Sequence, residues 1–270
     1  MKNKKALLWL LIPLLLIFTN CIQVNTKVIV NKDGSGTIEY TYIISDNFVA
    51  FMNKMSKEKS DKPDVDLVDQ MIAEGVPQKA AANFGEGVTF VSYEKISTDV
   101  GKGFKGIYSF ADIGKVTLNQ NPMNPDAKEG QSQDLKEYYH FQFQPGNPAT
   151  LVIIQPKKEL SKDQNSTPQK EAEISDDMLE MIINLYKDMK ISMQVTVNGA
   201  ITETNARYVD KAASTVTLLE IDFGKLTEDK EGFKALMKKN PKSIGEMEKM
   251  LGKTPGLKME LAEKLRVKFD

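Results

Sequence analysis

The chain has 270 residues, a formal net charge of −1, one cysteine and one histidine. A nearly neutral chain without long basic runs lacks the electrostatic field that nucleic-acid binding requires, so we expect no nucleic-acid partner. Its fractions of apolar (41%) and charged (27%) residues are those of a globular protein with a buried core.

The first twenty residues have the parts of a secretory leader. Three lysines precede an apolar run over residues 6–18, and Thr19 and Asn20 then lead to Cys21. The apolar run is shorter than the roughly 20 residues that a helix needs to cross a bilayer. The pattern therefore predicts a signal peptide over residues 1–20 and a mature domain over residues 21–270.

This ending on cysteine resembles the lipobox of bacterial lipoproteins, in a looser form similar to that of spirochaetes because Asn20 stands where Gly or Ala is usual. In that family the leader is cut before the cysteine, whose thiol carries a diacylglycerol and whose amine is acylated, typically with palmitate. The resemblance implies lipidation of Cys21 and a place in the bacterial cell envelope. Ile22 after the cysteine implies the outer membrane, while the periplasmic or surface face stays open. The alternative is an uncleaved hydrophobic anchor.

Lipidation of Cys21 would leave the mature domain without a thiol, so disulfides, thiolate metal sites and cysteine nucleophiles are not expected. The one tryptophan, Trp9, also lies in the leader. The mature domain therefore lacks a tryptophan platform for stacking sugars or quaternary ammonium groups.

Alternating and β-branched residues predict that the mature domain opens on a hairpin, with strands over residues 22–30 and 37–45 joined by a turn that contains Asp33-Gly34. Asp46 can cap a helix that continues with apolar residues at helical spacing. A second helix is predicted over residues 64–73, and a second hairpin over residues 88–98 and 104–112 around a loop of Gly101, Lys102 and Gly103.

The second part of the chain alternates strands and helices. The predicted strands are residues 138–144, 149–155 (a central strand), 190–197, 200–204 and 215–223, and the predicted helices are residues 176–189, 227–239 and 243–251. Asn198-Gly199 is expected to join residues 190–197 and 200–204 as a hairpin. Residues 157–174 have almost no apolar side chains and predict low order. Residues 261–269 fit either a helix or a strand.

A short pattern occurs twice, each time at the end of a predicted strand. Residues 112–116 and 222–226 both read Asp, apolar, Gly, Lys, apolar. This suggests two β-β-α-β-β halves, residues 21–118 and 136–226, followed by a helical tail over residues 227–270; the alternative is chance similarity. We interpret Asp112 and Asp222 as residues that accept backbone N–H bonds in a turn.

Two sets of residues are candidates for chemistry. Asn31, Asp33 and Ser35 are spaced like the first ligands of an EF-hand calcium loop, but Tyr42 occupies the position of the bidentate glutamate, so a plain hairpin turn is the stronger reading. His140 is the one histidine and falls on the more polar face of its strand, which favours a solvated or hydrogen-bonded side chain over a catalytic one. We expect no metal or other cofactor and no catalytic residue.

The sequence therefore predicts an α+β domain, an antiparallel sheet of hairpins with helices packed on one face. The expected function is that of a membrane-anchored, non-enzymatic lipoprotein that acts by binding or scaffolding, with an envelope or surface protein as its partner. One alternative is a periplasmic hydrolase that uses paired carboxylates. Another is a carrier of an apolar ligand, in a pocket lined by Phe51, Met55, Met181 and Tyr186.

Overall fold

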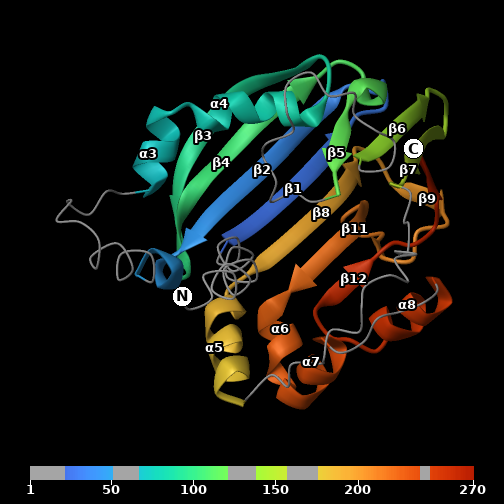
Figure 1. The fold of residues 1–270 in the computed structure, drawn as a ribbon. Helices are drawn as coiled ribbons and strands as arrows, with labels where there is room; N and C mark the ends of the chain where they lie inside the picture. The colour runs from blue at the N-terminus through green and yellow to red at the C-terminus, as the bar shows by residue number, and fades with distance from the viewer. Residues whose placement is uncertain (1–21, 51–66, 121–137, 157–175, 238–243) are drawn as a thin grey trace, which may run out of the picture.

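The computed structural model describes residues 22–50, 67–120, 138–156, 176–237 and 244–270 (Figure 1). The predicted signal peptide, Cys21, and the predicted low-order segment, residues 157–174, lie outside these ranges. The predicted α+β class is confirmed, but the strands form two sheets rather than one.

The larger sheet has eight strands in the order β10-β11-β8-β1-β2-β4-β3, with β12 paired to β11. Its strands are β1 (Ile22–Val30), β2 (Gly36–Ser45), β3 (Val88–Ser97), β4 (Gly101–Phe110), β8 (Lys190–Val197), β10 (Val209–Asp210), β11 (Thr215–Asp222) and β12 (Leu257–Met259). The ladder between β1 and β8 is parallel, which departs from the predicted all-antiparallel sheet. β1 is an inner strand because β2 pairs with its other edge.

The smaller sheet has five strands in the order β5-β6-β7-β13-β9. They are β5 (Thr117–Asn119), β6 (Tyr138–Gln144), β7 (Ala149–Ile154), β9 (Ile201–Thr204) and β13 (Lys264–Phe269). β7 is the middle strand, so its prediction as a central strand is confirmed. The tail over residues 227–270 is not helical throughout, because β12 is a strand that was not predicted. Residues 261–269, which fitted either a helix or a strand, contain the strand β13.

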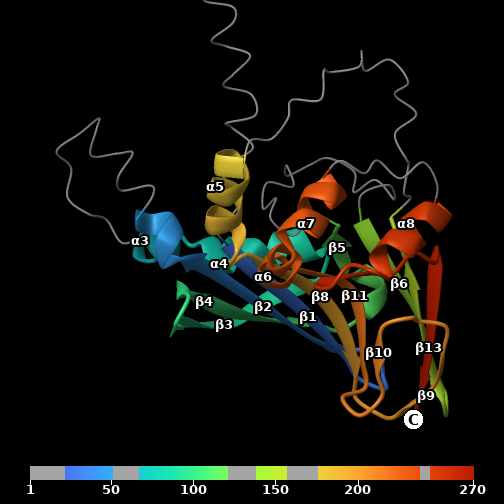
Figure 2. The same ribbon diagram turned by 90° about the horizontal axis from the view of Figure 1, so that it is seen from below.

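The helices lie on one side of the larger sheet, as predicted (Figure 2). They are α3 (Leu67–Ala73), α4 (Val76–Lys79), α5 (Asp176–Tyr186), α6 (Phe223–Glu228), α7 (Lys230–Met237) and α8 (Ile244–Leu251), with short 3-10 helices at Ala80–Phe84 and Ile113–Lys115. The helix expected to begin with Asp46 as its cap is present over residues 46–50, but the Ser45 hydroxyl is the cap and accepts from the Phe48 amide at 3.2 Å.

The main core lies between the larger sheet, the smaller sheet and the 3-10 helix Ala80–Phe84. Val28, Ile38 and Tyr108 are fully buried on one face of the larger sheet, and Leu151 and Leu265 from the smaller sheet join them in one apolar cluster. Because strand side chains alternate between faces, the opposite face carries polar residues. One sheet face is thus buried by helices and by the second sheet.

The second predicted hairpin turns earlier than expected, because Gly101 and Gly103 belong to β4 rather than to the loop. A Cβ at Gly103 would collide with the carbonyl oxygen of Tyr42 on the paired strand β2. Glycine is therefore required here by the close approach of two backbones. The sequence reading as a Gly-rich loop was wrong for this physical reason.

The predicted hairpin around Asn198-Gly199 is also wrong. β8 already has β1 on one edge and β11 on the other, so no edge is left for the following strand. β9 pairs with β13 instead, and the Asp270 amide donates to the Ala200 carbonyl. Asn198-Gly199 therefore leads the chain from the larger sheet into the smaller one.

The two halves proposed from the repeated pattern share an order of elements but not an arrangement. In the first half β1, β2, β3 and β4 all belong to the larger sheet, whereas in the second half β6 and β7 belong to the smaller sheet and β8 and β11 to the larger one. The local resemblance is real: the Asp112 carboxylate accepts from the Gly114 amide at 2.8 Å, and the Asp222 carboxylate accepts from the Lys225 amide at 3.1 Å. Both residues have the turn-forming role predicted for them.

Candidate functional site

We call the end of the larger sheet at which β1 begins the proximal end. Ile22 is in register with Ile44 of β2, and Gln23 is in register with Lys190 of β8. The first residues after Cys21 are thus held in ladders, and the first complete pairing on both sides occurs at Gln23. No linker separates the predicted lipidation site from the folded domain.

Side chains also tie the proximal end together. The Gln23 side-chain amide donates to the Asp188 carbonyl at 3.0 Å, and the Asn47 amide donates to the Asp188 carboxylate at 2.7 Å. Asp188 lies in the short connection from α5 to β8, so these bonds join residues at the start of β1, after β2 and before β8. The start of β1 is therefore fixed to three segments of the chain.

The charges at the proximal end are balanced once the ends of β2 and β4 are included, with Lys102, Lys187, Lys190 and Lys225 against Asp46, Asp99, Asp188 and Asp222. The Asp222 carboxylate lies 3.6 Å from the Lys190 ammonium and 3.9 Å from the Lys225 ammonium, and its other oxygen caps α6. Lys187 adds an exposed cation, and Asp188 adds a carboxylate beside it. Sequence reasoning found Asp222 as a turn former but not as the ion-pair partner of Lys190, because that contact depends on how β11 and β8 pair.

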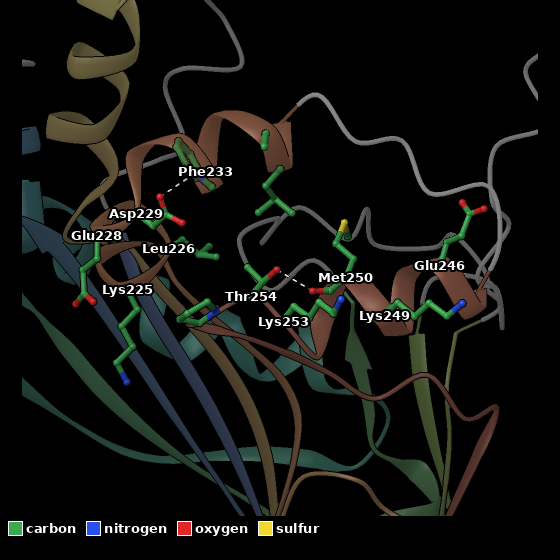
Figure 3. A pocket seen from close by; sticks show the side chains of 14 residues that line it. Lys225, Leu226, Glu228, Asp229, Phe233, Glu246, Lys249, Met250, Lys253 and Thr254 are labelled. Carbon is green, nitrogen blue, oxygen red and sulfur yellow. Dashed lines mark hydrogen bonds between the residues drawn. The ribbon is translucent and has the colours of Figure 1, made fainter.

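A second feature is a hollow between α6, α7 and α8, which we call the helical groove (Figure 3). Its volume is about 550 Å³, within the range of small-molecule sites. Its apolar lining includes Leu226, Phe233, Leu236 and Met250. Leu226 and Phe233 belong to a small apolar cluster with Leu179 of α5, so this wall of the groove is supported by packed side chains.

The polar lining of the helical groove carries both signs of charge. Lys249 and Lys253 come from α8 and the residues after it, while Glu228 and Asp229 come from the end of α6 (Figure 3). The Asp229 carboxylate is already engaged, because it accepts from the Gly232 amide at 2.9 Å. The groove therefore combines an apolar wall with a mixed, nearly neutral polar lining, which suits an apolar ligand better than a small ion.

The pocket predicted for an apolar ligand lay elsewhere. Phe51 and Met55 are outside the described residues, and so is the side chain of Met181. Tyr186 packs against Phe223, with ring centroids 5.6 Å apart, and so belongs to the packing between α5 and α6. The sequence predicted the amphipathic helices around the groove, but a hollow between helices depends on their placement, which periodicity does not report.

The weak calcium candidate is a compact hairpin turn. The Ser35 hydroxyl and amide both donate to the Asp33 carboxylate, at 2.7 and 3.0 Å. These two donors lower the pKa of Asp33. The Asn31 side-chain amide donates to the Ser35 hydroxyl at 3.0 Å, and the Asn31 side-chain oxygen accepts from Asn198. These groups therefore satisfy one another within the turn and across to Asn198.

The one histidine is partly buried in the smaller sheet. Burial lowers the pKa of His140, and its Nε2 atom has no hydrogen-bond partner in the described part of the chain. The Gln155 amide is likewise buried without a partner at the end of β7. In the sheet, His140 lies between Thr117 of β5 and Ile154 of β7.

Among the described carboxylates, that of Glu260 is buried and accepts a hydrogen bond from the Tyr208 amide at 2.8 Å. A hydrolase of the predicted type needs a carboxyl group with a raised pKa. Glu203, like Asp33, shows the opposite shift, because a hydrogen bond from Lys268 lowers the pKa of Glu203. Among the described residues, no group of three or more His, Cys, Asp or Glu side chains is placed to hold a metal ion.

Comparison with known proteins gives little further information. No protein-family model matches the chain, and no curated protein matches it. A solved structure, the folded domain of the Mycobacterium tuberculosis protein LppM determined by NMR, is similar at 13% identity over 76% of this chain and 84% of that chain, with a TM-score of 0.31. Such a TM-score carries no inference about function. In the described ranges no helix is long and apolar enough to cross a membrane.

Proposed function

We propose that this chain is a membrane-anchored, non-enzymatic lipoprotein of the bacterial cell envelope that acts by binding or scaffolding. The observation that supports this proposal is the join between leader and fold: the lipobox-like ending is followed at once by β1, an inner strand of the larger sheet. An uncleaved anchor would also tether the domain, but the ending on Cys21 favours cleavage and acylation.

Acylation of Cys21 would make a durable anchor. Each buried methylene group contributes about 0.8 kcal/mol, so two or three acyl chains hold a protein in a bilayer far longer than one. Ile22 after the cysteine favours the outer membrane as the destination. An envelope or surface protein is the expected partner of the folded domain.

The experiment is metabolic labelling of the full chain with palmitate. The wild type should incorporate the label, whereas Cys21→Ser should not incorporate it. Ser35→Ala, which changes a hydroxyl in the folded domain, is a matched control and should be labelled like the wild type. Equal labelling of the wild type and Cys21→Ser would contradict lipidation.

A second candidate function, a carrier of an apolar ligand, is favoured by the helical groove. The groove is large enough for part of an acyl chain and has the side chains of Phe233, Leu236 and Met250 in its lining. Leu236→Asp should weaken binding of a fluorescent fatty acid at least tenfold, because it places a charge against the acyl chain. Lys211→Asp, on the turn after β10, should leave binding unchanged. Binding that is equal in both variants would contradict this function.

A further inference from the structure

We infer that the proximal end of the larger sheet rests on phospholipid headgroups, with the strands directed away from the bilayer. This orientation rests on the proposed lipidation of Cys21. It assigns an interaction surface, made by the start of β1 and the segments tied to it, and a partner, the headgroup layer of the membrane that holds the lipid.

The covalent geometry sets how close the surface must lie. Consecutive Cα atoms are about 3.8 Å apart, so an acylated Cys21 would hold Ile22 within about 4 Å of the anchor point. Ile22 is in register with Ile44, and Gln23 pairs on both sides. Lifting the domain from the membrane would therefore require opening ladders on an inner strand rather than extending a linker.

The same end of the sheet gathers several segments at the level of Ile22. β8 begins there with Lys190, β11 ends there with Asp222, and β2 ends there with Ser45. The Gln23 and Asn47 bonds to Asp188 hold the connection before β8 at the same level. The exposed residues there are polar, among them Asp46, Asn47, Lys187 and Lys190, and they lie beside half-buried apolar residues such as Ile22 and Val100. The exposed polar groups suit contact with hydrated headgroups.

The opposite end of the sheet stands clear of the bilayer. β1 spans nine residues, and strands rise about 3.3 Å per residue, so its far end lies about 30 Å from the anchor. The headgroup layer on each side of a bilayer is only about 5–8 Å thick. With β1 directed away from the bilayer, the turn after β1, which contains the exposed Lys32, and the turn after β10, which contains the exposed Lys211, lie beyond the headgroups.

The charges at the proximal end determine whether attraction to anionic lipids contributes to the orientation in addition to the tether. Lys190 and Lys225 share the Asp222 carboxylate, and Lys187 lies next to Asp188 in the chain. Lys102, Asp46 and Asp99 lie at the same end of the sheet, so four lysines stand against four aspartates. A lysine near an anionic membrane contributes about 1 kcal/mol when it is not offset by acids. Here the acids offset the lysines, so the orientation depends on the tether and should be the same on neutral and anionic membranes.

The test measures energy transfer from single labelled cysteines to a headgroup-labelled acceptor lipid. Lys187→Cys reports the proximal end and Lys32→Cys the opposite end, both in the full chain processed in cells and reconstituted in phosphatidylcholine vesicles. An acylated Cys21 offers no thiol to the label, so each variant carries one reactive thiol. Transfer should be several-fold stronger from position 187 than from position 32, with or without added phosphatidylglycerol.

A linker variant is the matched control. About 20 Gly and Ser residues inserted between Cys21 and Ile22 span roughly 25 Å on average, and should remove most of the difference between the two positions. Equal transfer from both positions in vesicles that carry the protein would overturn the orientation while leaving lipidation intact. A chain that fails to float with vesicles and carries no acyl group would overturn lipidation, and the orientation with it.

Discussion

The Tyr108 hydroxyl of β4 donates a 2.7 Å hydrogen bond to the Pro77 carbonyl of α4, and both residues are buried. This bond ties a short helix to the inner face of the larger sheet, and the Phe84 ring packs beside it with its centroid 5.0 Å from that of Tyr108. The aromatic residues of β2 and β4 are covered by the segment that this bond positions.

Tyr108→Phe tests the bond. The variant keeps the ring but leaves the buried Pro77 carbonyl without its donor, which costs about 1–3 kcal/mol. Urea unfolding at neutral pH should show this loss in the free energy of unfolding. Tyr93→Phe, at a side chain exposed on β3, is the control and should unfold like the wild type. Equal stability of Tyr108→Phe and the wild type would contradict the role of the bond.

Gly103→Ala tests the contact between β4 and β2. The added methyl group would meet the Tyr42 carbonyl oxygen, so one strand must shift along its whole ladder. We expect a loss of several kcal/mol, on the order of the larger single-substitution effects. Gly114→Ala is the matched control, because its methyl group comes no closer than 3.1 Å to the Asp112 carboxylate. Similar melting temperatures for the two variants would show that the strands can separate locally.

The one histidine predicts an acid-dependent stability. Burial lowers the pKa of His140 in the folded state, so its neutral form is stabilised. This contribution is present above the unfolded pKa of about 6.5 and is lost as the pH falls towards the folded pKa. The free energy of unfolding should therefore decrease between pH 7.5 and 5.5 in the wild type and decrease less in His140→Gln. If the free energy of unfolding changed with pH equally in the wild type and in His140→Gln, burial of His140 would not be the cause of the pH dependence.

Two half-buried tyrosines of β2, Tyr40 and Tyr42, predict a loss of stability at alkaline pH. Burial raises the pKa of Tyr42 to about 12, and burial also raises the pKa of Tyr40 beside it. Stability is complete below the unfolded pKa of about 10 and falls as the pH rises through the folded values. Tyr42→Phe should flatten the decline above pH 10, measured by circular dichroism in urea. An unchanged alkaline profile would show that this ring is not desolvated.

Asp222→Ala tests the cap of α6. The variant removes the bond to the Lys225 amide, and capping residues contribute about 1 kcal/mol. The exposed ion pairs with Lys190 and Lys225 add little to this loss. Glu231→Ala, in the first turn of α7, is the control for removal of an acid. It should lower the free energy of unfolding in urea by less than about half of the loss expected for Asp222→Ala. A loss no greater than that of Glu231→Ala would contradict the capping role.

Local pattern predicted the strands whose residues alternate clearly. β1, β6 and β8 have the predicted bounds, because each combines β-branched or aromatic side chains with adjacent turn residues. The Asp112 and Asp222 turns were also predictable, since their bonds run to amides two or three residues away. Such interactions depend only on residues that are a few positions apart in the sequence.

Pairing between distant segments was not predictable in the same way. The residues after Asn198-Gly199 would suit a hairpin, but β11 occupies that edge of β8. The parallel ladder of β1 with β8 and the helical groove also depend on where separate elements are placed. The proximal end could be located only in part from sequence. Cys21 precedes it directly, but the hydrogen bond from the Gln23 side chain to the Asp188 carbonyl joins residues 165 positions apart.

The parallel ladder between β1 and β8 has a consequence for folding. Gln23 pairs with Lys190, so one edge of the first strand has no partner until the chain has been synthesised as far as residue 197. Contacts between such distant segments form slowly, and an unpaired strand edge is prone to aggregation. A chain that ends before β8 would therefore leave one edge of β1 open to pairing with other molecules.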